Sequence, residues 1–225
     1  MSNRVETSLI VLVGLAFLNA GSAQEITPTP SLSPFGPRIV RFAFVPPPLD
    51  GTLSLGIYDN AGKLVRVLHQ EAELDEFTVE ADGLATQWDG KNDDGVDSPA
   101  GKYRARGYAV GASKIDDIGP APNRRPVDVT NHVLIKLVHN PLSKTTTAVV
   151  DLAVGCDDEN CFLKTTDGLP LVTVTERTDA WRTALARRSD TSVDLLLDDG
   201  DTIDQLRVSN VNQMMAFDCG EIELK

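Results

Sequence analysis

The sequence predicts an all-β protein with two β-rich regions. Apolar and polar residues alternate over short stretches, which is the pattern of half-buried strands. Polar turns that contain glycine separate these stretches, and segments with helical spacing are scarce. With 225 residues, of which 41% are hydrophobic, the chain is long enough for two small domains.

Residues 1–23 are expected to be a secretory signal peptide. Arg4 lies in a short polar start, Leu9–Leu18 is apolar, and Gly21-Ser22-Ala23 offers small residues for cleavage. A bilayer span needs roughly 20 apolar residues, so a permanent anchor is the weaker alternative. No cysteine lies at the cleavage site to accept a lipid. We expect a mature protein in the periplasm or outside the cell, with no stable membrane insertion.

The charge of the chain argues against two classes of partner. Its formal net charge is −12, so its surface repels phosphate backbones and anionic lipid heads. Nucleic acid is therefore not an expected partner. Solubility outside the cell explains the acidic surface, and attraction of cations or basic proteins remains the alternative.

The first β-rich region begins after a proline-rich linker. Residues 24–37 contain four prolines among serine and threonine, a composition that favours an extended segment. Ile39–Val45 alternates as a strand whose Phe42 and Phe44 point inward. Leu53–Tyr58 is a second strand, and a glycine turn joins it to a third at Lys63–Leu68.

The rest of this region has a strand, a long polar turn and a closing strand. Phe77–Val79 and Tyr103–Val110 have strand patterns. The motif residues of this region are Gly62, Trp88, Asp89, Gly90, Gly95, Gly101 and Tyr103. Glycines permit tight turns, and a tryptophan at this place fills the space between two sheets.

Three motifs in this order resemble a known family. They are the hairpin Ile57–Arg66, the segment Trp88–Gly95 and the closing Pro99–Tyr103. Together they look like the immunoglobulin-like domain of the flagellar hook-capping (FlgD-type) family, here over residues 38–112. The resemblance implies an immunoglobulin-like β-sandwich that serves as a spacer, assembly surface or sorting element. It does not imply a role in flagella, since the other parts of the hook-capping protein are missing.

A second β-rich domain is expected at 127–225, after a linker at 113–126 that contains Pro120, Pro122 and Pro126. Strand patterns recur at 133–138, 147–154, 169–175, 192–197 and 205–208. A short helix is expected at 179–188, where Asp179 caps a helical spacing of apolar residues.

A weak internal repeat suggests one architecture for this second region. Val150-Asp151-Leu152 and Val193-Asp194-Leu195 lie 43 residues apart, a period found in propeller blades. Two blades cannot close a propeller. The region is therefore expected to be either incomplete propeller-like blades or a small sandwich.

The cysteines predict one disulfide. Cys156 and Cys161 bracket a short acidic loop and can pair in an oxidising compartment. Zinc would need further ligands that the spacing of the three histidines does not supply. Cys219 is left over, either as a buried small residue or for pairing between chains.

We assign no catalytic, cofactor-binding or metal-ligating residue from the sequence. No nucleophile elbow, phosphate loop or zinc-protease motif occurs. Calcium is the one cofactor weighed, at Asn92–Gly95, Asp157–Glu159 or Asp198–Asp201, but acidic turns are ordinary in an acidic protein.

The expected function is an exported, non-enzymatic structural, assembly or binding module of the cell envelope or exterior. An envelope or extracellular protein is the expected partner. The alternative is a glycan-binding accessory or degenerate hydrolase domain, for which Trp181 is the one tryptophan available in the second region.

Overall fold

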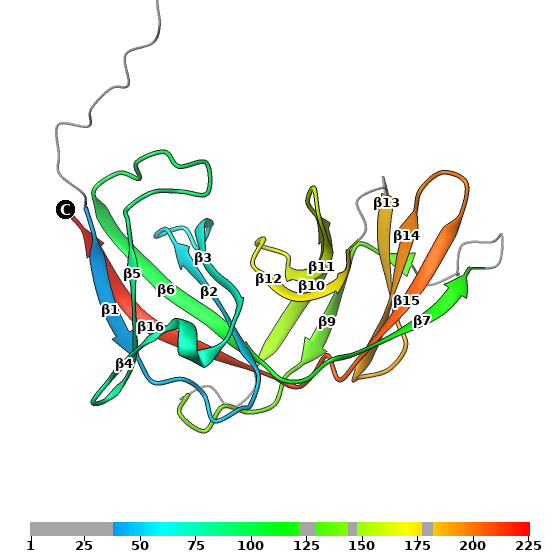
Figure 1. Ribbon diagram of the computed structural model, residues 1–225, viewed down its shortest axis with the longest axis horizontal. Coiled ribbons are helices and arrows are strands. Elements are labelled where there is room, and N and C mark those ends of the chain that lie inside the picture. The colour runs from blue at the N-terminus through cyan, green and yellow to red at the C-terminus, as the bar shows by residue number, and fades with distance from the viewer. Residues whose placement is uncertain (1–37, 122–128, 144–147, 177–181) are drawn as a thin grey trace, which may run out of the picture. The chain divides into compact units, whose positions relative to one another are not determined.

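The computed structural model describes residues 38–121, 129–143, 148–176 and 182–225. The expected signal peptide and the linker at 24–37 lie outside these residues. The described chain is all-β, as predicted, with antiparallel strands in four sheets (Figure 1). Its helical element is one 3-10 turn, η1 (Leu74–Glu76). Within the described ranges, no helix has the length and apolar character needed to cross a bilayer.

Sheets A and B form the first sandwich. Sheet A contains, in spatial order, β1 (Val40–Phe44), β5 (Gly83–Trp88) and β4 (Thr78–Glu80). Sheet B contains β16 (Met214–Leu224), β6 (Gly101–Val110), β2 (Thr52–Tyr58) and β3 (Leu64–Ala72). Phe42 and Phe44 point into the core between them, where Phe44 stacks on Phe217 with ring centroids 5.2 Å apart.

Sheets C and D form the second sandwich. Sheet C contains, in spatial order, β12 (Pro170–Thr175), β11 (Cys161–Thr165), β10 (Val149–Cys156) and β9 (His132–Lys136). Sheet D contains β7 (Lys114–Pro120), β15 (Ile203–Ser209), β14 (Ser192–Asp198), β13 (Arg182–Arg187) and β8 (Val129–Thr130). Side chains such as Ile135, Leu152 and Leu195 fill a second core and are fully buried.

The last strand of the chain belongs to the first sandwich. β16 pairs with β6 along its length, and Phe217 and Leu224 enter the first core. The chain thus leaves the first sandwich between β6 and β7 and returns between β15 and β16 (Figure 1). The sequence placed all of 127–225 in one second domain, whereas residues 214–224 complete sheet B.

Two local expectations from the sequence are wrong. Residues 114–120 of the expected linker form β7, which pairs with β15 and is largely exposed, so its apolar alternation is weak. The expected helix at 179–188 is strand β13 over 182–187, because pairing with β14 outweighs local helical spacing. Residues 179–181 lie outside the described residues.

Polar contacts join the two sandwiches. A carboxylate oxygen of Glu71 on β3 accepts hydrogen bonds from the backbone N–H of Thr173 at 2.9 Å and from its hydroxyl at 2.5 Å. Arg106 on β6 pairs with Asp167 at 3.0 Å. Within sheet B, the Arg106 guanidinium also lies 3.8 Å from the centroid of the Tyr58 ring. The Glu71–Thr173 and Arg106–Asp167 contacts, together with the two chain passages, join the sandwiches at several points.

The weak repeat aligns strand with strand but not sheet with sheet. A shift of 43 residues places β10 on β14, β11 on β15 and β12 on β16. β9 to β12 form one four-stranded meander, whereas β16 leaves its neighbours and joins sheet B. The region is therefore a sandwich of two sheets and not a pair of equivalent four-stranded blades.

Candidate functional site

The outer face of sheet D carries a group of charged side chains and, further along the same face, a pocket. Alternation along β14 sends Val193, Leu195 and Leu197 into the second core. Asp194 and Leu196 therefore point to the opposite face. Cross-strand partners on this face are Arg207 for Asp194 and Gln205 for Leu196.

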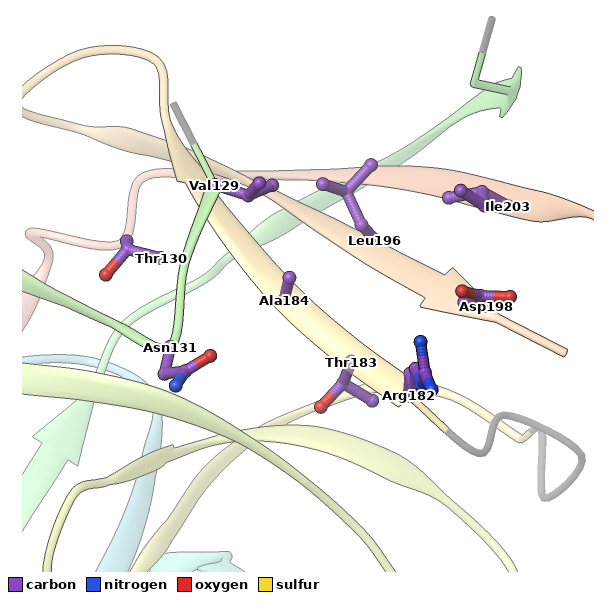
Figure 2. A pocket seen from close by; sticks show the side chains of 9 residues that line it. All are labelled: Val129, Thr130, Asn131, Arg182, Thr183, Ala184, Leu196, Asp198 and Ile203. Carbon is purple, nitrogen blue, oxygen red and sulfur yellow. The ribbon is translucent and has the colours of Figure 1, made fainter. Parts of the chain in front are cut away.

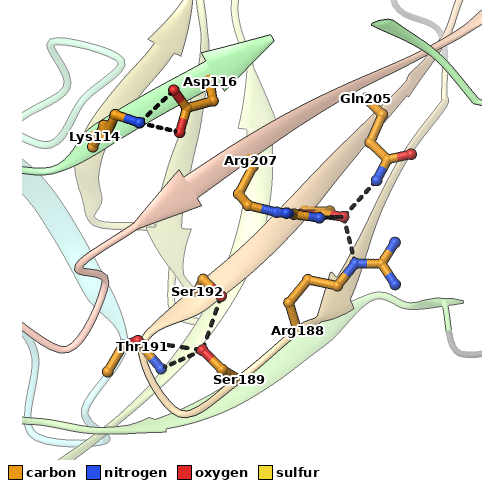
Figure 3. Close-up of polar contacts among 9 residues, drawn as sticks. Lys114, Asp116, Arg188, Ser189, Thr191, Ser192, Gln205 and Arg207 are labelled. Atoms are coloured by element: carbon orange, nitrogen blue, oxygen red, sulfur yellow. Dashed lines mark hydrogen bonds and ion pairs between the residues drawn. The ribbon is translucent and has the colours of Figure 1, made fainter. Parts of the chain in front are cut away.

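Asp194 is the centre of an ion cluster on this face. Its side chain is 0% exposed, although it lies on the side of the sheet away from the core. One carboxylate oxygen accepts a bond from Arg207 Nε at 2.7 Å, and the other accepts bonds from Arg207 Nη2, Gln205 Nε2 and Arg188 Nε. Figure 3 shows Arg188, Gln205 and Arg207 directed toward the same carboxylate.

The donors decide the charge of this carboxyl. Burial alone would raise the pKa of Asp194, but hydrogen bonds from Arg207, Arg188 and Gln205 outweigh it and hold the pKa below its usual value. The hydrogen bond between Arg207 and Asp194 also raises the pKa of the Arg207 guanidinium. Asp194 is therefore ionised at neutral pH and fixes both guanidinium groups.

The cluster has more positive than negative charge. On the neighbouring strand β7, Asp116 lies opposite Arg207 and pairs with Lys114 at 2.7 Å. The three cations Lys114, Arg188 and Arg207 thus face the two anions Asp116 and Asp194. This local excess of one positive charge is set in a chain with a net charge of −12.

A pocket of about 470 Å³ lies further along the same face, where Leu196 follows Asp194 by two residues on β14 (Figure 2). The residues that line it do not include the members of the ion cluster. Its apolar wall is formed by Val129 on β8, Ala184 on β13, Leu196 on β14 and Ile203 on β15. Arg182, Thr183, Asp198, Thr130 and Asn131 supply the polar part of the lining. The volume lies within the range of small-molecule sites, and the lining combines apolar and polar groups as such sites do.

The short strand β8 forms one end of the pocket. β8 pairs with β13 only through Val129 to Ala186 and Thr130 to Leu185. After Asn131, the chain enters β9 of sheet C. The pocket extends from Val129–Asn131 across β13 and β14 to Ile203 on β15.

No family model, curated protein or solved structure matches this chain. The interpretation of the site therefore depends on its own geometry.

The residues singled out from the sequence lie elsewhere. Cys156 and Cys161 form the expected disulfide, which closes the β10–β11 hairpin of sheet C. Cys219 is a free thiol beside the first core, and burial raises its pKa to about 12. A thiol with this pKa is protonated and unreactive at neutral pH.

The family-like motif residues have places in the first sandwich. Trp88 is fully buried, packs against Tyr103 with centroids 4.8 Å apart, and donates from Nε1 to the carbonyl of Lys91 at 2.7 Å. The Tyr103 hydroxyl donates to the carbonyl of Pro99. Asp89 accepts from the N–H of Lys91, and the motif glycines all have positive φ: Gly62, Gly90, Gly95 and Gly101.

The three segments weighed for calcium form hydrogen-bonded turns. Asn92 accepts from the N–H of Val96, Asp157 from that of Asn160, and Asp199 from that of Thr202. Backbone N–H groups of Glu159 and Asn160 lower the pKa of Asp157. Among the described residues, no group of three or more acidic, histidine or cysteine side chains is placed to hold a metal ion.

Sequence reasoning did not find the ion cluster. Its signal was Asp194 itself, a charged residue inside the apolar stretch 193–197, which was considered only as part of a repeat. A buried aspartate in such a strand requires partners. The partners Arg188 and Arg207 could not be named without the strand register.

Proposed function

We propose that this chain is a non-enzymatic binding module of the cell envelope or exterior. The outer face of sheet D holds the ligand or partner, and the two joined sandwiches act as its scaffold. The observation that carries the proposal is the fully buried Asp194, which fixes two arginines beside a preformed pocket.

The arrangement costs stability that an apolar residue would not cost. Burying a carboxylate is unfavourable, and replacing buried ion pairs by apolar residues is often neutral or stabilising. A cluster that exists only to hold β13, β14 and β15 together has no need of surplus positive charge. Preorganised arginines beside a pocket are instead typical of recognition sites.

The first sandwich fits a second part of the proposal. We infer that it is a FlgD-type immunoglobulin-like domain whose seventh strand, β16, comes from the end of the chain. Its three-stranded and four-stranded sheets agree with the seven strands of the simplest immunoglobulin-like sandwiches. In this proposal, its role is that of a spacer or assembly element.

Glycan binding is the less supported alternative. Sugar rings commonly pack on exposed aromatic faces, but the residues that line the pocket include no aromatic side chain in the part of the chain described. Trp181, the tryptophan considered for this role, lies outside the described residues.

The test is retention of envelope components by the immobilised full chain. The wild type should retain a defined component, Arg188→Gln should lose it, and Arg104→Gln should keep it. Arg104 is the matched control because it also pairs with an aspartate, Asp218, but on the first sandwich. Equal retention by all three proteins would contradict the placement of the binding site on sheet D.

A further inference from the structure

We propose that the outer face of sheet D binds a carboxylate with an apolar chain. Arg188 and Arg207 bind the carboxylate group of the ligand, and the pocket over Leu196 binds its apolar chain. This inference rests on the proposed binding function and names its ligand class.

The two arginines have donors left over. Arg188 uses Nε for Asp194, and its two Nη groups have no partner among the described residues. Arg207 uses Nε and Nη2, and its Nη1 has no partner in the part of the chain that the structure describes. Both side chains remain accessible, at 37% and 38% exposure. Guanidinium forks match the two oxygens of a carboxylate.

The local charge selects an anion. The surplus positive charge of the cluster repels cations and attracts an oxyanion, and fixed guanidinium groups need little reorganisation to bind it. Asp194 has its oxygens occupied by four hydrogen bonds, so it does not compete for the same arginine nitrogens.

The spacing of the face sets the length of the ligand. Leu196 follows Asp194 by two residues on the same face, a separation of about 7 Å. Gln205 bridges the two, since it pairs with Leu196 and donates to Asp194. A carboxylate with about five to eight carbons spans this distance and reaches the apolar wall of Val129, Ala184 and Ile203.

Two sources offer this chemistry. A medium-chain fatty acid has a carboxylate and an apolar tail, and a peptide that ends in leucine has a terminal carboxylate and an apolar side chain. Both place an apolar group within the reach that the site requires.

The experiment is isothermal titration calorimetry on the full chain with octanoate and with N-acetyl-glycyl-leucine, beside neutral octanamide. At least one of the two carboxylates should bind. Octanamide should bind with an affinity at least about tenfold lower than that carboxylate. Binding of octanoate alone identifies a fatty acid as the source, and binding of the peptide alone identifies a peptide terminus. Failure of both carboxylates, or equal binding of octanamide, overturns the proposal.

Variants tie the binding to the residues. Arg188→Gln should weaken binding of the carboxylate about tenfold to a hundredfold, and Arg104→Gln should leave it unchanged. If Arg188→Gln does not fold, Arg188→Lys keeps a charge near Asp194 but lacks the fork, and should still weaken binding by about fivefold or more. Unchanged binding in a folded Arg188 variant contradicts the assignment.

The two proposals fail in different ways. If envelope components are retained through Arg188 but neither carboxylate binds, the binding function stands and the ligand class is wrong. If neither result is obtained, both are wrong.

Discussion

Replacing Asp194 with asparagine should lower the free energy of unfolding by about 2–4 kcal/mol at neutral pH. The carboxylate accepts four hydrogen bonds. Asparagine keeps one acceptor oxygen and turns an NH₂ group toward arginine donors, so about two charge-assisted bonds of roughly 1.5–3 kcal/mol each are lost. The sum is discounted because both arginines are partly exposed and can bind water instead.

The loss of unfolding free energy caused by Asp194→Asn should become smaller at low pH. The pKa of Asp194 in the folded chain lies below its usual value, because the donors outweigh the effect of burial. Its contribution is therefore complete above the ordinary aspartate pKa of about 4, and it is lost as the pH falls through the folded pKa. The gap between wild type and Asp194→Asn should be largest at neutral pH and should shrink below about pH 4.

The assay is urea unfolding followed by tryptophan fluorescence at neutral pH and at about pH 3. Asp218→Asn is the control, since Asp218 pairs with Arg104 on an exposed strand face and should cost no more than about 1 kcal/mol. A cost for Asp194→Asn below about 0.5 kcal/mol at neutral pH would refute the reasoning. So would a cost that is the same at both pH values.

Three further outcomes follow from the fold. Phe217→Ala should lower the free energy of unfolding by about 3–5 kcal/mol in urea melts, because the ring is buried against Phe44 in the first core; a cost under about 1 kcal/mol would contradict that place for β16. Glu71→Ala should reduce the protection of the Thr173 amide in hydrogen exchange, because Glu71 accepts a hydrogen bond from that amide. Glu71→Gly should be less destabilising than Glu71→Ala by about 1 kcal/mol in urea melts, because residue 71 has a φ of 46°; the reverse order would count against backbone strain there. Cys219 should react with iodoacetamide far more slowly in the folded chain than in urea near neutral pH, since burial raises its pKa to about 12, and equal rates would show an accessible thiol.

The sequence predicted the parts of the fold that depend on local patterns. Alternation placed Phe42 and Phe44 correctly in the first core, and cysteine spacing predicted the disulfide of the β10–β11 hairpin. It did not predict β7, because an exposed edge strand has little apolar alternation. The place of β16 was also missed, since its partner β6 lies more than a hundred residues earlier in the chain.

The candidate site could not be predicted from the sequence, because it depends on which strands pair and in which register. Arg188, Asp194 and Arg207 meet because β13, β14 and β15 pair in one register, and a shift by one residue would put Asp194 in the core. The pocket depends on the pairing of β8, β13, β14 and β15, which brings Val129, Ala184, Leu196 and Ile203 together. Neither property follows from residue spacing alone.

The most direct measurement of the central claim is nuclear magnetic resonance of the isotope-labelled full chain, titrated with octanoate and, separately, with N-acetyl-glycyl-leucine. With at least one of these ligands, the account predicts that the shifts concentrate on the guanidinium groups of Arg188 and Arg207 and on the amides around Leu196 and Gln205. Shifts confined to the first sandwich or to sheet C, or no shifts with either ligand, would contradict it.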